Sequence, residues 1–252
     1  MSHSRNSASR NIAIGWAVAG LLAAGFAALG TWQYGRAGEK EAVLADAAAV
    51  LEARDPVPLA VAADPDRARR LDWAAGQGRF ADVAAFRLDN QRHDGQVGVR
   101  AYRVFLPDAG APLLVDLGWL PIGEGRAMPA VPKPDGAVQV RGLLAPPPSP
   151  GLRMGSGIAA IGDGCLLTRV DPDAIARAAG LETQLAPRVL RLDPALPFGH
   201  ARDLAVLPNT VPPERHLGYA VQWFGLSATV LVVALVLTLR RRRPSNGPRR
   251  TP

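Results

Sequence analysis

Two long stretches without a charged residue lie near the two ends of the chain. Residues 12–30 and 217–239 hold 19 and 23 consecutive uncharged, mainly apolar positions. A helix needs about 20 such residues to cross a hydrocarbon layer about 30 Å thick. Aromatic residues, which favour the membrane interface, stand near the ends of both stretches. The pattern predicts two transmembrane helices, over residues 12–35 and 216–239.

Between these stretches the pattern of apolar residues changes twice. A helical repeat continues through residues 38–55 and ends before Pro56. Short β-type runs separated by turn residues then predict strands near 71–80, 84–90, 99–106, 112–120, 137–145, 165–170 and 188–193. The expected fold class is a membrane protein of the α+β type, in which two transmembrane helices flank a mainly antiparallel β outer domain with a few short helices.

Turn-forming and breaking residues divide the predicted outer domain. The pairs Asp94-Gly95 and Asp135-Gly136 predict turns. The proline-rich stretch 145–151 cannot form a helix or a central strand, so it predicts a loop between two halves of the sheet. Asp171 and Gly180 bracket a short helix as a cap and a stop.

The net charge of +7 resides in the two ends of the chain. Residues 1–11 and 240–252 carry eight of the 29 basic residues and no acidic residue, which leaves 21 basic against 22 acidic residues in the middle. A nucleic-acid surface would place its basic residues on the folded domain, so no nucleic-acid partner is expected. Basic tails remain on the cytoplasmic side of a membrane. We therefore expect cytoplasmic tails at 1–11 and 240–252, a periplasmic domain at 36–215, and membrane lipid as a partner.

The first apolar stretch and the single cysteine each bear on the class of protein. The first span could instead be a cleaved secretory signal, but the apolar core of such a signal is usually only about 7–15 residues long. Cys165 is the only cysteine, so an intramolecular disulfide, a CxxC pair and a four-thiolate zinc site are all excluded.

No enzyme motif is present. The outer domain has His93 and His200 but no GxSxG sequence, no phosphate-binding glycine loop and no HExxH helix. Both histidines are expected to lie in solvated loops, and a hydrolase is the least favoured class. We expect a protein that is not an enzyme.

Polar and aromatic residues gather where both spans meet the outer leaflet. Trp32, Gln33 and Arg36 end the first span, and His216, Tyr219 and Trp223 begin the second. This arrangement could offer an imidazole to a haem iron, aromatic rings to the porphyrin and Arg36 to the propionates. The alternative is a belt of interfacial anchors, with Arg36 on lipid phosphates. Gln33 and Gln222 favour a buried partner, because an amide in an apolar helix seeks one.

Small residues also recur along the first span. Gly20, Ala24 and Ala28 stand four residues apart, in line with Trp32, and such a stripe allows two membrane helices to approach closely. The second span is the expected partner of this stripe. The alternative is that alanine is simply common in this chain.

Four blocks of the sequence are LGTWQYGR, LDNQRHDGQVG, LLVDLGWLP and HLGYAVQWF. Together they resemble the surfeit locus protein 1 family, whose members assist assembly of haem–copper cytochrome c oxidase. The first span resembles the family pattern LGxWQxxR, and the second resembles HLxYAxxWF. The domain blocks LDNQRHDGQVG and LLVDLGWLP are also similar to family blocks. The matching positions are Leu29, Gly30, Trp32, Gln33 and Arg36; Leu88, Asp89, Asn90, Asp94, Gly95 and Gly98; Leu114, Val115, Gly118, Trp119 and Pro121; and His216, Leu217, Tyr219, Ala220, Trp223 and Phe224.

This resemblance implies a role in maturing oxidase subunit I in the bacterial inner membrane. Its implied partners are subunit I and haem a synthase, and its implied cofactor is haem a, bound transiently. The position at which bacterial members bind the haem iron corresponds to His216. Our hypothesis is that His216 ligates haem a while Tyr219, Trp223 and Trp32 shield it and Arg36 meets its propionates. The alternative is a scaffold for subunit I that does not bind haem.

Overall fold

The computed structural model describes residues 2–149, 155, 157–206 and 211–242, and these form two compact units. The helix pair comprises the chain up to Val43 and from Thr210 onward, and the β unit comprises Leu44–Asn209. Each unit is described separately below. Helix α1 (Ser2–Ala53) contributes to both, while α3 (Pro213–Arg242) belongs to the helix pair.

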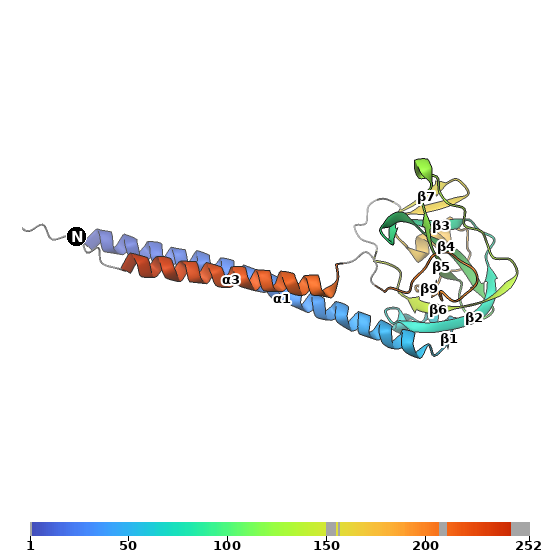
Figure 1. The fold of residues 1–252 in the computed structure, drawn as a ribbon, viewed down its shortest axis with the longest axis horizontal. Helices are drawn as coiled ribbons and strands as arrows, with labels where there is room; N and C mark the ends of the chain where they lie inside the picture. The colour runs from blue at the N-terminus through green and yellow to red at the C-terminus, as the bar shows by residue number, and fades with distance from the viewer. Residues whose placement is uncertain (1, 150–154, 156, 207–210, 243–252) are drawn as a thin grey trace, which may run out of the picture. The chain divides into compact units, whose positions relative to one another are not determined.

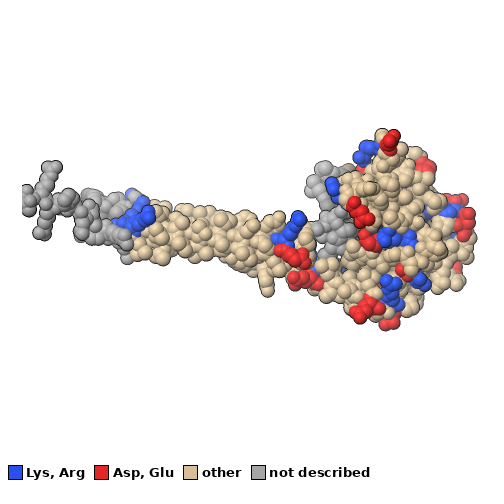
Figure 2. Space-filling model, viewed as in Figure 1, with Lys and Arg blue, Asp and Glu red and all other residues tan. Residues whose placement is uncertain are grey.

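The helix pair consists of the two predicted spans, lying side by side and running in opposite directions (Figure 1). Both helices are long and apolar enough to cross a membrane. The described surface of the pair is almost free of charge between the basic residues at one end and the residues of both signs at the other (Figure 2). Together with the β unit, this confirms the predicted class, a membrane protein of the α+β type.

The seam between the two helices follows a heptad repeat. On α1 the residues least exposed within the pair are spaced alternately three and four apart, at Ala19, Ala23, Phe26, Gly30, Gln33, Ala37 and Lys40. On α3 the same spacing selects Pro213, His216, Ala220, Trp223, Ser227, Val230 and Ala234. This spacing is that of helices packed at a shallow angle along their length.

The predicted stripe of small residues does not face α3. Gly20, Ala24 and Ala28 are all exposed, and a Cβ added at Gly20 would meet no atom within 4 Å. The close approach occurs instead at Gly30, where an added Cβ would lie 2.8 Å from the Phe224 ring. The prediction was wrong because alanine and glycine occupy several faces of α1, and the partner helix selects only one.

The β unit is built on a closed ring of five strands. These are β2 (Asp72–Phe80), β6 (Ala137–Ala145), β9 (Val189–Leu192), β5 (Leu113–Pro121) and β4 (Gln96–Pro107). The ring closes where Gly78, Arg79 and Phe80 of β2 pair with residues 105–107 of β4. The sheet continues from β4 through β3 (Ala85–His93), β8 (Gly164–Leu167) and β7 (Ile158–Ile161), and β1 (Val57–Pro58) pairs with β2.

The sheet is mainly antiparallel, as predicted. Six strand pairs are antiparallel, and the pairs β1–β2, β3–β8 and β5–β9 are parallel. Three 3-10 turns, η1 (Leu59–Ala63), η2 (Pro65–Arg67) and η3 (Glu124–Arg126), lie between strands. The short helix α2 (Pro172–Ala178) begins at Asp171, whose side chain accepts a hydrogen bond from the Ala174 amide. All seven predicted strands are present, whereas β1 and β7 were missed.

Apolar residues fill both sides of this sheet. One core includes Phe80, Phe105 and Leu190, and a second, covered by α2, includes Phe86, Leu114 and Ile175. Within the β unit the last turns of α1 place Ala47 against Leu71, Leu143 and Ala145. The predicted loop at 145–151 begins with the final residue of β6, and its last two residues lie outside the described part of the chain.

Candidate functional site

A hydrogen-bonded pair of polar side chains lies in the seam of the helix pair. His216, in the first turns of α3, places its Nδ1 atom 2.7 Å from Oε1 of Gln33 on α1. Both residues occupy seam positions and are partly buried. An amide oxygen can only accept a hydrogen bond, so Nδ1 of His216 carries the proton and donates it. The predicted need of Gln33 for a buried partner is confirmed, whereas Gln222 is exposed.

The second ring nitrogen of His216 has no partner among the residues that the structure describes. Its Nε2 atom is buried and has no hydrogen bond within the described part of the chain. When Nδ1 holds the proton, Nε2 presents a lone pair, which is the form of imidazole that binds metals. A hydrogen bond from the other ring nitrogen fixes this form and orients the ring. The pair therefore has the chemistry of an axial ligand, although side chains around Nε2 would have to move to admit one.

A second contact joins the segment that precedes α3 to α1. The buried side chain of Lys40 donates a hydrogen bond through Nζ to the carbonyl oxygen of Val211. One turn earlier on α1, Arg36 forms an exposed ion pair with Glu39 at 2.8 Å. Lys40 thus helps hold His216 at the level of Gln33, whereas the guanidinium of Arg36 stays at the surface. Such exposed pairs contribute little to stability.

The aromatic residues of the candidate site differ in position. Trp223 lies in the seam, with its ring stacked 5.6 Å from that of Phe26. Tyr219 and Trp32 are instead 43% and 60% exposed. Ala220, rather than Tyr219, shares the seam face with His216 and Trp223, and it is almost fully buried.

The exposed members of the site share one flank of the pair. The seam residues of a heptad repeat alternate between two positions, a and d. When two such helices run antiparallel, the residues immediately before the a positions of both helices lie on the same side of the pair. Arg36 and Tyr219 occupy these positions, one residue before Ala37 and Ala220, and Trp32 stands beside Arg36 on α1. Gln33, His216 and Trp223 are the seam positions nearest this flank. The five predicted site residues therefore lie on one side of the pair.

Three contributors to this site were missing from the predicted set. The sequence predicts a buried partner for Gln33, but Gln33 is not among the predicted haem-contacting residues. Lys40 and Phe26 are not predicted to contribute, although both stand seven residues from Gln33 and share its seam position. Extending the heptad repeat from Gln33 in both directions would have found them.

The two histidines of the β unit do not form a catalytic group. His93 ends strand β3, and its ring packs on Trp119 at 5.4 Å and lies 3.6 Å from carboxylate oxygens of Asp94 and Asp203. The expectation of a loop position is wrong for His93, because the Asp94-Gly95 turn directly follows the strand. The backbone amide of His200 donates to Leu117, and burial, aided by nearby Arg202, lowers the pKa of the imidazole. Across the described residues, no cluster of three metal-binding side chains occurs.

The comparisons with known proteins bear directly on this geometry. The model of the SURF1 family, the surfeit locus protein 1 family, matches residues 20–228, which include every residue of the candidate site. The chain belongs to the SURF1 family. A search of curated proteins finds no match. SURF1 proteins are assembly factors linked in general to cytochrome c oxidase, and they are not known as enzymes. This membership confirms the resemblance seen in the sequence and makes oxidase subunits the expected class of partner.

Proposed function

We propose that this SURF1 protein assists assembly of cytochrome c oxidase by receiving haem a and holding it for insertion into subunit I. His216 supplies the axial ligand, and Gln33 orients it. Haem a is the cargo, so the protein performs no covalent change on it. Haem iron accepts an imidazole nitrogen as an axial ligand.

The observation that carries this proposal is the unpaired Nε2 atom of His216. A buried polar atom without a partner costs about 1–3 kcal/mol. Among the described residues of the helix pair, Nε2 of His216 is the one side-chain atom of this kind. Here the neighbouring Nδ1 is held by Gln33, which leaves Nε2 in the ligating form. A ligand that binds Nε2 would relieve this cost. Transient coordination of haem a supplies such a ligand.

The flank beside His216 has groups suited to the rest of the cargo. Trp32 and Tyr219 are exposed aromatic residues on that flank, and Trp223 lies in the seam next to it. Flat aromatic rings pack against a porphyrin face, and a guanidinium pairs with carboxylates. Arg36 holds only an exposed ion pair with Glu39, so it is free to exchange that partner for a haem propionate.

The charge distribution supports a location in the bacterial inner membrane. The tails 1–11 and 240–252 are basic and lack acidic residues, which favours two cytoplasmic ends and a periplasmic domain at 36–215. His216 and Gln33 then lie at the outer leaflet. Subunit I and haem a synthase, the two proposed partners, would meet the helix pair from the side within the membrane.

An optical spectrum of the detergent-purified protein from cells that make haem a tests the proposal. We expect a haem a band for the wild type and its loss in His216→Ala, because the axial ligand is gone. His200→Ala, which alters a half-buried histidine of the β unit, is the matched control and should retain the band. Equal haem content in the wild type and His216→Ala would contradict the assignment of His216.

Gln33→Leu tests the role of the hydrogen bond to the ligand. Losing a partner that orients a ligating histidine typically costs about 10–100-fold in affinity. We expect Gln33→Leu to weaken haem a binding by that order while Gln222→Leu, an exposed amide on α3, leaves it unchanged. Titration of haem into both variants measures this effect. Identical affinities would show that Gln33 has no part in positioning His216.

A scaffold that binds subunit I without haem is the second candidate. The burial of Nε2 favours it, because a closed seam gives the iron no direct path. A scaffold predicts no haem in the wild-type protein and an unchanged association with subunit I in His216→Ala. Co-purification of subunit I with both proteins, measured on the same samples as the spectra, separates the two functions.

A further inference from the structure

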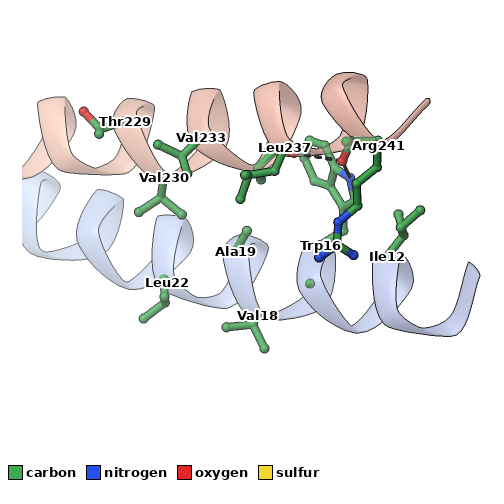
Figure 3. A pocket seen from close by; sticks show the side chains of 13 residues that line it. Ile12, Trp16, Val18, Ala19, Leu22, Thr229, Val230, Val233, Leu237 and Arg241 are labelled. Atoms are coloured by element: carbon green, nitrogen blue, oxygen red, sulfur yellow. Dashed lines mark hydrogen bonds between the residues drawn. The ribbon is translucent and has the colours of Figure 1, made fainter. Parts of the chain in front are cut away.

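An apolar groove runs along the helix pair at the end that carries the terminal arginines. Its volume is about 370 Å³, and it lies between the start of α1 and the end of α3 (Figure 3). The residues that line it are Ile12, Gly15, Trp16, Val18, Ala19 and Leu22 of α1, and Thr229, Val230, Val233, Ala234, Leu237, Thr238 and Arg241 of α3. The lining is mainly apolar, and its one charged residue, Arg241, lies at one end.

Small residues keep this groove open. Gly15 and Ala19 of α1 and Ala234 of α3 all line the groove, and a Cβ added at Gly15 would meet no atom within 4 Å. The branched side chains of Val233 and Leu237 form its walls. The groove therefore has the form of a channel for a narrow, flexible hydrocarbon.

The charged end of the groove has an uncompensated cation. Figure 3 shows Arg241 reaching from α3 toward α1, beside Trp16 and Ile12. The Trp16 indole is occupied, because its Nε1 donates to Oγ1 of Thr238 at 3.1 Å. No acidic residue lines the groove, and Arg241 makes no ion pair with any residue that the structure describes. The guanidinium is thus available to an anion from outside the chain.

We propose that this groove is a binding site for one anionic phospholipid. An acyl chain fills the aliphatic channel, and the headgroup phosphate accepts hydrogen bonds from Arg241. Charge complementarity selects this occupant: the groove joins an apolar channel to an unpaired guanidinium, and an anionic lipid joins an acyl chain to a phosphate. Guanidinium groups bind phosphate through paired hydrogen bonds. The interfacial tryptophan beside Arg241 belongs at the same headgroup level.

This site is separate from the polar cluster at the other end of the pair. His216 and Arg241 are 25 residues apart on α3, which corresponds to about 38 Å along a helix. The lipid site therefore does not depend on whether the protein carries haem. The groove lies on the flank that also holds Arg36 and Tyr219. Leu22 and Val233, which line the groove, stand immediately before seam residues, as Arg36 and Tyr219 do.

Native mass spectrometry of the full chain in a non-ionic detergent tests this proposal. Dioleoylphosphatidylglycerol and dioleoylphosphatidylcholine share their acyl chains and differ in net charge. We expect one phosphatidylglycerol molecule to bind more tightly than phosphatidylcholine, and Arg241→Gln to weaken only the former, by about fivefold. Arg240→Gln, at an exposed arginine outside the groove, is the matched control and should change the affinity by less than about twofold.

A second pair of variants tests the channel. Gly15→Leu places a side chain in the groove, while Gly25→Leu adds the same side chain in open space elsewhere on α1. We expect Gly15→Leu to reduce retention of both lipids and Gly25→Leu to leave it unchanged, with equal helix content by circular dichroism. Equal affinity for the two lipids, or equal losses in Arg241→Gln and Arg240→Gln, would show non-specific annular lipid and overturn the proposal.

Discussion

The β unit and the helix pair treat buried polar groups differently. In the β unit the side chain of Arg188 is fully buried and donates to the Asp72 carboxylate at 2.6 Å and to the carbonyl oxygens of Arg70 and Val61. Arg87 is equally buried and donates to Asp163 and to the Pro129 carbonyl. Nε of Arg188 and Nη1 of Arg87 lack a partner among the described residues, but each guanidinium still donates at least two hydrogen bonds. In the helix pair, His216 makes one hydrogen bond, and its Nε2 has no partner in the described part of the chain.

This difference separates structural from functional polarity. A buried arginine with two or three acceptors joins strands and loops, so its removal damages the fold. A buried imidazole with one partner joins fewer groups, and under the proposed function its second nitrogen serves as the haem a ligand. The charged residues visible on the β unit in Figure 2 are of both signs and interspersed.

The largest expected effect is on the buried arginine of the β unit. Asp72→Asn removes the charge that pairs with Arg188, and breaking a buried ion pair on one side typically costs about 3–5 kcal/mol. We expect a loss of about that size in the free energy of unfolding of the full chain in detergent, measured by denaturant titration. Asp82→Asn, at an exposed ion pair with Lys133, is the control and should have no measurable effect.

The same ion pairs determine how the β unit responds to acid. Burial alone would raise the pKa of Asp72, but hydrogen bonds from Arg67 and Arg188 outweigh it and hold that pKa below the usual 3.8. Burial opposes a similar lowering of the pKa of Asp193, which accepts from the Ala195 amide and from Arg141. Both carboxylates therefore stabilise the fold above pH 3.8, and this stabilisation is lost as the pH falls through their lowered pKa values. Asp72→Asn should flatten this dependence.

A smaller effect is expected at the closest approach in the helix pair. A leucine at Gly30 would force the Phe224 ring aside, and overpacking of this kind costs about 1–3 kcal/mol. We expect Gly30→Leu to reduce disulfide formation between cysteines introduced at Ala23 and Ser227, in a chain that also carries Cys165→Ser. Gly25→Leu, which meets no neighbour, should leave cross-linking unchanged. Equal yields in both variants would place the helix contact elsewhere.

The smallest effect is expected from a single polar bond across the seam. The hydroxyl of Ser227 donates to the Ala23 carbonyl at 2.9 Å. Side-chain hydrogen bonds between membrane helices contribute about 0.6 kcal/mol on average. Ser227→Ala should therefore reduce disulfide formation between cysteines introduced at Gly30 and Phe224. This loss should be smaller than the loss that Gly30→Leu causes between cysteines at Ala23 and Ser227. A larger loss would mean that polar contacts, rather than close packing, hold the pair together.

The sequence predicted the helices and strands better than it predicted which of them lie next to one another. Apolar run length predicted both spans, and β-type runs with turn residues predicted seven of the nine strands. The two missed strands, β1 and β7, have only two and four residues, and their burial is irregular. The parallel pairing of β5 with β9 joins segments far apart in the chain, and no local pattern encodes such a contact.

The candidate site shows the same limit. His216, Trp223 and Gln33 could be recognised as unusual in their setting, because polar and aromatic residues interrupt apolar helices there. Which of them meet depends on the rotation of α1 against α3, and several alternative stripes of alanine and glycine on α1 were compatible with the sequence. The seam that includes Ala19, Ala23 and Gly30 was distinguishable only once the partner helix was in place.

The position of β9 in the ring has a consequence for the order of folding during synthesis. β9 lies between β5 and β6, so the ring cannot close until the ribosome has delivered residue 192, only 21 residues before α3 begins. Until then β5 and β6 present unpaired edges, which are prone to pairing with other chains. The long sequence separation of these pairings also slows folding. With the proposed periplasmic location, almost all of the β unit must cross the membrane before that unit can be completed and protected.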